Sequence, residues 1–214
     1  MKESALQIFE LLCQRHPGLS CLRPQMQRAL ELLTECAHQG GRIMTCGNGG
    51  SAADAEHIVG ELLKGFLQRR PLPETDVNKL CAMFGKDGLY MARHLQQGVK
   101  AFSLVSGVAF STAYANDVEA DLVFAQQVWT QASPGDVVWG ISTSGNSVNV
   151  NFALRAAHAR GARTLGFTGR DGGSMASLCD VEIRAPAQET PRIQELHLPL
   201  YHALCAALEE ELFG

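Results

Sequence analysis

Residues 42–61, RIMTCGNGGSAADAEHIVGE, contain an apolar run, a glycine-rich turn and a polar helical face. The run at 42–46 predicts a strand. The glycines within 47–51 allow the positive φ and the close backbone approach that an anion-binding turn needs. The pattern then predicts a helix on which His57 and Glu61 are four residues apart and share one face. An imidazole and a carboxylate at this spacing can share a metal ion or a proton.

The composition is that of an ordinary globular domain. The 214 residues are 46% hydrophobic and 19% charged, which suits one α/β domain with a sizeable core. The net charge is −4 and no basic run is longer than Arg69-Arg70, which argues against a nucleic-acid partner. With no apolar signal core and no run of 18 apolar residues, we expect a cytoplasmic location and no membrane partner. Seven cysteines without a Cys-x-x-Cys pair indicate reduced thiols.

Beyond residue 100, apolar runs alternate with helical patterns. Strands are expected at 101–105, 137–142, 163–168 and 181–184, and helices at 108–132 with a break near Asn116-Asp117, at 150–161, near 173–178 and at 189–212. Two amphipathic helices, 4–16 and 24–38, precede the first strand. Such a pair packs on a sheet face or on a partner subunit, and we expect a subunit contact. This order predicts a single α/β domain, a doubly wound five-stranded parallel sheet flanked by helices. Residues 1–41 supply an N-terminal helical pair of the same domain as residues 42–214.

A second polar turn, Ser-Thr-Ser-Gly-Asn-Ser at 142–147, follows an expected strand. Its hydroxyls could simply cap the next helix. Four hydroxyls in six residues exceed what capping needs, which favours phosphate binding at the helix start. Since ligands of such sheets bind outside the carboxyl ends of the strands, the turns at 47–51 and 142–147 should converge on one crevice. Neither turn has the spacing of a nucleotide triphosphate loop or a dinucleotide fingerprint, which leaves a sugar phosphate as the expected ligand.

The two turns, Cys-Gly-Asn-Gly-Gly-Ser and Gly-Ile-Ser-Thr-Ser-Gly-Asn-Ser, resemble those of sugar isomerase (SIS) domains. Asp54-Ala55-Glu56-His57 with Glu61, and the run 192–197 with His202, narrow the resemblance to the phosphoheptose isomerase group. That group converts sedoheptulose 7-phosphate to a heptose 7-phosphate. The resemblance therefore implies the SIS fold, an aldose–ketose isomerase and a phosphorylated sugar as substrate.

Carried over residue by residue, the resemblance implies a metal site and a set of substrate contacts. The implied ligands of zinc are His57, Glu61, Gln194 and His202. The implied substrate contacts are Asn48, Gly49, Gly50, Ser51, Asn116, Asp117, Ser142, Thr143, Ser144, Ser147 and Gln194. Glu61 takes the place of the group's base and His202 that of its acid, which together move a proton between adjacent carbons through an enediol. Zinc itself rests on the resemblance alone, since other divalent metals share these ligand types.

The spacing of two implied ligands bears on assembly. Gln194 and His202 are about 12 Å apart along a regular helix, whereas each side chain with its metal bond reaches about 6 to 7 Å from its Cα. Either the helix is irregular near Pro199, or the site takes residues from two subunits. We expect the second arrangement, and hence a homo-oligomer, by resemblance a homotetramer, with active sites between subunits.

Residues 74–100 depart from the resemblance, which covers about residues 42–70 and 101–213. Two prolines make 69–76 a loop, the pattern after it is unclear, and Asp87 is expected to cap a helix that Gly98 ends. In the family the chain passes almost directly into the next strand, so we interpret about two dozen residues here as an insertion. We hypothesise that the insertion lies near the sugar-binding mouth and alters substrate choice.

Other interpretations stay open. Taken alone, His57 and His197 would each more often be a satisfied core or surface histidine, and Cys46 is expected to be a small buried residue rather than a nucleophile. The alternative function is a non-catalytic SIS module that binds a phosphosugar or a replication-initiator protein, against which the presence of Glu61 and His202 argues. A DNA-binding regulator would need an N-terminal helix-turn-helix domain, for which roughly 40 residues leave little room.

Overall fold

A computed structural model describes residues 1–214 and confirms the predicted sheet. Five parallel strands have the order β2-β1-β3-β4-β5, the doubly wound arrangement expected from the alternation of strands and helices. The strands are β1 (Ile43–Gly47), β2 (Ala101–Ser103), β3 (Val137–Ile141), β4 (Arg163–Thr168) and β5 (Val181–Arg184). The helices are α1 (Glu3–Arg15), α2 (Arg23–His38), α3 (Gly50–Leu63), α4 (Glu74–His94), α5 (Val108–Tyr114), α6 (Val123–Gln131), α7 (Val148–Ala159) and α8 (Thr190–Phe213). Short helical turns occupy Pro17–Leu22, Ala115–Glu119, Ala120–Leu122 and Gly173–Leu178.

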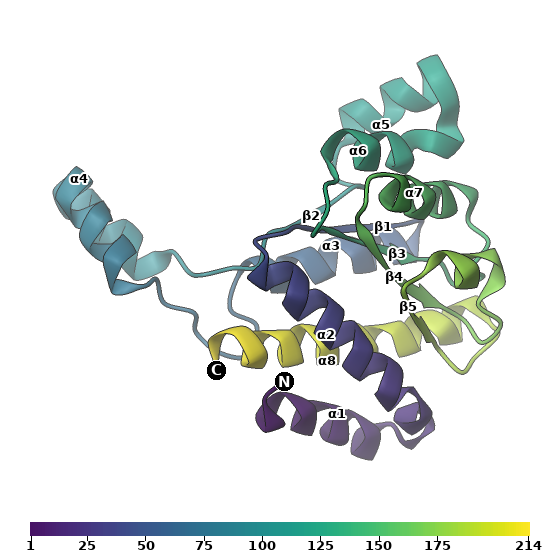
Figure 1. The fold of residues 1–214 in the computed structure, drawn as a ribbon, viewed down its shortest axis with the longest axis horizontal. Coiled ribbons are helices and arrows are strands. Elements are labelled where there is room, and N and C mark those ends of the chain that lie inside the picture. The colour runs from purple at the N-terminus through teal and green to yellow at the C-terminus, as the bar shows by residue number, and fades with distance from the viewer.

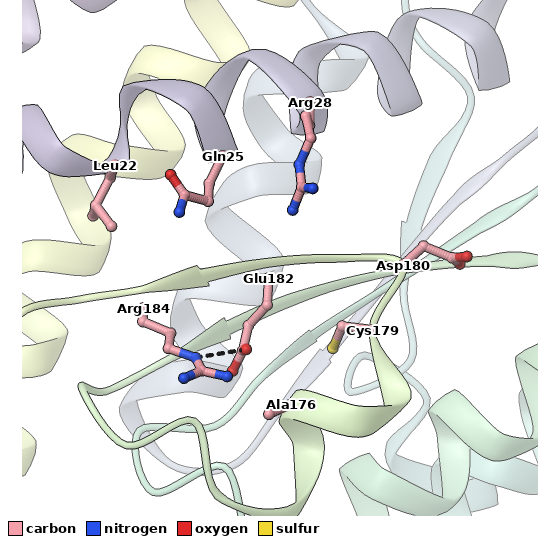
Figure 2. Close-up of a pocket in the computed structure, with 8 residues that line it drawn as sticks. All are labelled: Leu22, Gln25, Arg28, Ala176, Cys179, Asp180, Glu182 and Arg184. Carbon is pink, nitrogen blue, oxygen red and sulfur yellow. Dashed lines mark hydrogen bonds and ion pairs between the residues drawn. The ribbon is translucent and has the colours of Figure 1, made fainter.

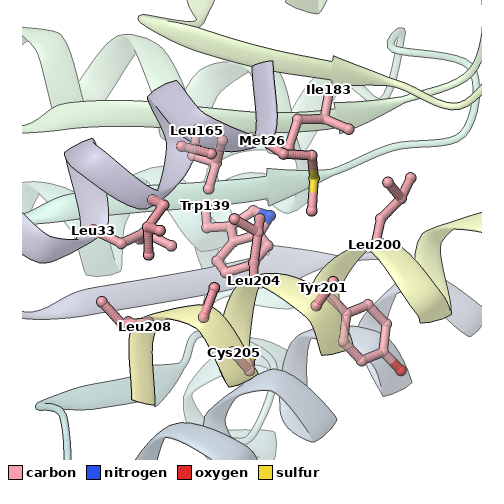
Figure 3. Packing of buried hydrophobic residues seen from close by; sticks show 14 of the residues in the cluster. Met26, Leu33, Trp139, Leu165, Ile183, Leu200, Tyr201, Leu204, Cys205 and Leu208 are labelled. Atoms are coloured by element: carbon pink, nitrogen blue, oxygen red, sulfur yellow. The ribbon is translucent and has the colours of Figure 1, made fainter. Parts of the chain in front are cut away.

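Helices cover both faces of the sheet (Figure 1). On one face α1, α2, α3 and α8 bury a large apolar cluster, and on the other α6 and α7 bury a smaller one. Side chains of β3 alternate between the two clusters, with Trp139 in the first and Val138 in the second. Trp139 is fully buried among residues of α2, β4 and α8 (Figure 3). The sheet thus has a core on each side, and its strand ends are free to carry polar turns.

The N-terminal helical pair covers a sheet face of its own chain. Helix α1 packs on α8, and Ala5, Phe9 and Leu12 are buried. The two ends of the described chain are tied together, because the backbone N–H of Lys2 donates to Glu211 and its Nζ donates to the carbonyl of Gly214. Helix α2 lies against α8 and β5, while the subunit contact expected for this pair stays a prediction.

Most boundaries lie within two residues of the sequence prediction. Strand β2 ends at Ser103 rather than at residue 105, because the chain turns at Leu104, whose N–H donates to Thr45. The break predicted near Asn116-Asp117 is a π-helical turn between α5 and the short helical turn before α6. None of the helices combines the length and the hydropathy needed to cross a bilayer.

The insertion differs from its prediction. Helix α4 begins at Glu74, inside the expected loop, and ends at His94 rather than at Gly98. It bends at Gly85, where φ is 53°, and Asp87 makes no capping hydrogen bond. Figure 1 shows α4 standing off the body, on the side away from the turns that follow β1 and β3. Within one chain the insertion therefore does not cover the expected sugar-binding mouth.

Candidate active site

The two polar turns meet where the winding of the sheet changes direction. Strand β1 lies between β2 and β3, so the turns after β1 and β3 flank the switch point at which doubly wound sheets bind ligands. Asn48 in the first turn and Asn149 at the start of α7 exchange two hydrogen bonds, of 2.8 and 3.0 Å. The expected convergence is therefore visible in the structure, and Asn149 is a residue that the sequence analysis missed.

The second turn holds its hydroxyls together without capping α7. The Oγ atoms of Ser142 and Ser147 are 2.9 Å apart, and Ser147 is the N-cap residue of α7 but makes no side-chain capping bond. Gly145 has φ of 66°, and a Cβ there would lie 1.9 Å from the carbonyl oxygen of Gly172, so only glycine fits. Thr143 and Ser144 stand beside these residues in the same turn. Uncapped N–H groups beside clustered hydroxyls favour the anion-binding interpretation over simple capping.

The first turn has the same character at the start of α3. Gly49 has φ of 56° and is the N-cap residue, again with no side-chain cap, and Ser51 is buried in the first turn of the helix. Gly50 faces Gln194, because a Cβ on Gly50 would lie 2.4 Å from the amide Nε2 of that residue. Gln194 therefore lies at the N-terminal end of α3, beside the first polar turn.

The expected metal and proton-transfer residues gather farther along α3. His57 Nε2 is 3.1 Å from Glu61 Oε1 and 3.4 Å from His202 Nε2, and Lys64 donates to the other oxygen of Glu61 at 3.0 Å. Burial, together with the neighbouring His57, lowers the pKa of His202 against an opposing effect of Glu61. His202 is thus disposed to be a neutral ring, with one nitrogen free to accept a proton or bind a metal.

Tyr201 and Asp54 orient the His57 ring. The Tyr201 hydroxyl lies 2.9 Å from His57 Nδ1 and 3.3 Å from Asp54 Oδ1. If His57 Nε2 binds a metal, Nδ1 carries the proton and donates to Tyr201, whose hydroxyl then donates to Asp54. Burial raises the pKa of Asp54, partly offset by this hydroxyl and by His57. Asp54 is therefore more than a first-turn carboxylate, and only the fold shows that Tyr201 reaches it.

The donor set fits a metal ion only in part. Two donors bound to a tetrahedral zinc lie about 3.3 Å from each other, which matches the two distances from His57 Nε2 to Glu61 and His202. No group of three or more His, Cys, Asp or Glu side chains within one chain is arranged to hold a metal ion. Gln194 lies beside Gly50, seven residues and about 10 Å of helix before His57. Since α8 runs unbroken through Pro199, no irregularity brings Gln194 to the cluster.

Two implied substrate contacts stand apart from both groups. Asn116 and Asp117 lie in the exposed π-helical turn after α5, and Asn116 Nδ2 donates to Asp117 at 2.8 Å. Within one chain, neither residue makes a hydrogen bond to the polar turns or to the group of His57, Glu61 and His202, the histidine cluster.

Cys46 and His197 are structural. Burial raises the pKa of the Cys46 thiol to about 12, which removes its nucleophilic form. Burial also lowers the pKa of His197 to about 4. The contact of 3.1 Å between its Nε2 and the carbonyl oxygen of Thr168 opposes this shift. The burial of Cys46 agrees with its prediction, and of the two interpretations left open for His197, core or surface, its burial gives the core.

One cavity of the single chain lies away from the predicted site residues. A cavity of about 330 Å³ opens between α2 and β5, lined on one side by Arg28 and on the other by Glu182 and Arg184 (Figure 2). It contains none of the predicted site residues. In a single chain, Asn48, Ser144 and His57 are exposed.

Two polar turns at the switch point of a doubly wound sheet define a candidate site for a small anionic ligand. The sequence profile of the SIS domain matches residues 19–83 and 90–169. The chain is 41% identical over 196 residues to the phosphoheptose isomerase of Thiobacillus denitrificans (90% of this chain, 86% of that protein). It is 39% identical over 208 residues to that of Pelobacter propionicus (97% and 93%). The structure of phosphoheptose isomerase GmhA from Neisseria gonorrhoeae superposes with a TM-score of 0.73 at 34% identity, covering 94% of this chain and 95% of that one. The chain therefore belongs to the SIS domain family and, within it, to the phosphoheptose isomerases.

Proposed function

We propose that the protein is a phosphosugar aldose–ketose isomerase that converts sedoheptulose 7-phosphate to a heptose 7-phosphate. The observation that carries this proposal is the gathering of Glu61, His57 and His202 on α3 and α8, in a chain whose relatives bear the name phosphoheptose isomerase. The polar turns at the switch point bind the phosphate group, through uncapped helix N-termini and the hydroxyls of Ser142 and Ser147.

The reaction moves one proton between two adjacent carbons of the sugar. Glu61 removes a proton from the carbon next to the carbonyl, and His202 exchanges a proton with the oxygens of the resulting enediol. Glu61 then returns its proton to the other carbon, which completes the interconversion of ketose and aldose. The ammonium group of Lys64 lies 3.0 Å from the Glu61 carboxylate and pairs with its charge.

The substitution Glu61→Gln tests the proposal. We expect turnover of sedoheptulose 7-phosphate to fall by about 10²- to 10⁴-fold, the usual contribution of a general base. Glu56→Gln is the matched control, because Glu56 lies on the same helix and accepts a hydrogen bond from Ser106 that glutamine can also accept. A panel of five-, six- and seven-carbon phosphosugars identifies the substrate. Turnover unaffected by Glu61→Gln would refute the role of the base.

We propose further that His57, Glu61 and His202 hold a divalent metal ion, zinc by family resemblance, with Gln194 from another copy completing the set. When bound, the ion would polarise the sugar carbonyl. In the wild type, zinc added after chelation should raise the melting temperature, because binding to the folded state stabilises it. His57→Ala should lose this rise. An equal rise in both proteins would exclude His57 as a ligand.

The shared site follows from the position of Gln194. Because Gln194 lies about 10 Å of helix away from His57 within one chain, a site that uses both must draw on two copies. We therefore propose a homo-oligomer, a tetramer by resemblance, with active sites between subunits. A stable monomer with full activity would contradict this arrangement.

A further inference from the structure

Helix α4 is a helical hairpin rather than a single rod. The bend at Gly85 folds its second half back, so that a Cβ on Gly88 would lie 2.0 Å from the carbonyl oxygen of Leu80, eight residues earlier. Gly88 is the one buried residue of α4, and Leu80, Cys81 and Ala92 around it are half-buried. The small interior of the hairpin is therefore made by its two halves against each other.

The hairpin is joined to the body by a defined two-stranded stalk. Pro71 and Gln96 form an antiparallel bridge, the N–H of Gln97 donates to the carbonyl of Arg70, and its side chain donates to the carbonyl of Pro71. At the base, Arg70 is buried and donates to Glu209 and to the carbonyls of Leu62 and Glu61. The direction in which the hairpin leaves the body is thus fixed by hydrogen bonds that begin at the end of α3.

The outer surface of the hairpin is apolar and uncovered. Six large side chains are between 37% and 67% exposed: Met83, Phe84, Leu89, Tyr90, Met91 and Leu95. No other helix or strand of the chain packs extensively on α4. If each of these large side chains presents about 200 Å² when fully exposed, the exposed parts of the six amount to roughly 600 Å². A stable interface buries about 800 Å² per partner, and two helical segments of this length are marginal without a packing partner.

The charge of the hairpin points to its partner. Residues 74–94 contain three acidic residues (Glu74, Asp76, Asp87) and three basic ones (Lys79, Lys86, Arg93), so the hairpin is neutral while the rest of the chain carries the net charge of −4. A neutral apolar surface has no attraction for a nucleic acid or an anionic membrane. A copy of the same surface can pack on it without charge repulsion, and a two-fold axis would bring the same surface of two copies together.

We propose that the α4 hairpins of two copies of this chain pair with each other, forming a clasp between subunits that is separate from the phosphate-binding turns. The proposal goes beyond the isomerase function and does not depend on it. Through Arg70, pairing of the hairpins would also fix the relative position of the two α3 helices that carry Glu61.

Hydrogen exchange of the purified wild type tests the clasp. We expect the amides of residues 74–94 to exchange at least tenfold more slowly at concentrations where the protein is assembled than on dilution. The double substitution Phe84→Asp/Tyr90→Asp places carboxylates in the apolar surface and should abolish this slowing, with α8 still protected. Asn78→Asp adds a carboxylate at an exposed polar position of the same hairpin and should leave it unchanged.

Mixing distinguishes the clasp from other contacts. Wild-type hairpins mixed with an excess of the double variant should lose their protection if hairpins pair with hairpins. Retained protection would place the hairpin on the body of another subunit and overturn the proposal. Exchange of residues 74–94 that is independent of concentration would also overturn it, whatever the result of the Glu61→Gln experiment.

Discussion

The two ends of α3 carry the two halves of the proposed site in different ways. At its N-terminal end, Gly50, Gln194 and the Asn48–Asn149 pair are joined by contacts within one chain. At its C-terminal end, the histidine cluster lies at the open surface, and the chain leaves for the α4 hairpin directly after it. Contacts within one chain therefore hold the first end together, whereas at the second end His57 stays exposed, which agrees with the proposal that another copy completes the site.

The largest expected effect comes from mixing two inactive variants, each with a substitution at a different end of α3. Glu61→Gln and Gln194→Ala should each be nearly inactive as pure proteins. If one site takes Glu61 from one copy and Gln194 from another, random mixed oligomers should regain roughly a quarter of wild-type activity. Activity that stays at the level of the single variants after subunit exchange would place both residues of a site in the same chain. Unmixed proteins taken through the same exchange procedure are the control.

The next largest effect concerns the buried ion pair of Arg70 and Glu209 beside the C-terminal end of α3. Glu209 is 1% exposed and accepts hydrogen bonds from the backbone N–H groups of Phe66, Leu67 and Gln68 and from Arg70. Glu209→Ala leaves the Arg70 charge buried and unpaired, so the free energy of unfolding should fall by about 3 to 5 kcal/mol in chemical denaturation. Glu210→Gln, next to it, should change the free energy by less than about 0.5 kcal/mol. Equal losses in the two variants would mean that the buried pair does not hold this end.

The smallest effect concerns His197 in the N-terminal half of α8, which lies against the N-terminal end of α3. The pKa of His197 is about 4 in the folded chain and 6.5 in its ordinary state. Between these values the unfolded chain binds a proton that the folded chain does not, so stability is full above pH 6.5 and falls as the pH drops to 4. The loss should be about 3 kcal/mol. His197→Gln, which can still donate to Thr168, should flatten the dependence measured by urea unfolding between pH 4 and 6.5. An unchanged slope would assign the acid sensitivity to other groups.

The sheet was predictable because its strands are short apolar runs between turn residues. Strands β1 and β3 to β5 lie within one residue of the predicted ranges, and the glycines and hydroxyls marked both polar turns. Helix α4 was harder to predict, since its apolar residues do not form one buried stripe and the bend at Gly85 breaks its period. Periodicity signals burial within a chain, and a segment that packs on nothing in its own chain gives a weak signal.

The residues of the candidate site could be named from the sequence, whereas the hydrogen bonds between distant segments could not. The pair His57 and Glu61 follows from helical spacing alone, whereas His202 enters only through the resemblance. Asn149, Tyr201 and Arg70 were missed because their partners lie 101 to 147 positions away along the chain. Such contacts depend on how the sheet is wound, and a pattern read over one or two helical turns does not contain them.

The packing of α1 on α8 has a consequence for synthesis of the chain. The apolar face with Phe9 is made first and its covering helix is made last, almost two hundred residues later. At about 5 to 20 residues per second, the first helix waits roughly 10 to 40 s on the ribosome before its partner emerges. During that interval the growing chain carries an uncovered apolar surface, and chaperones that recognise such surfaces would meet it there first.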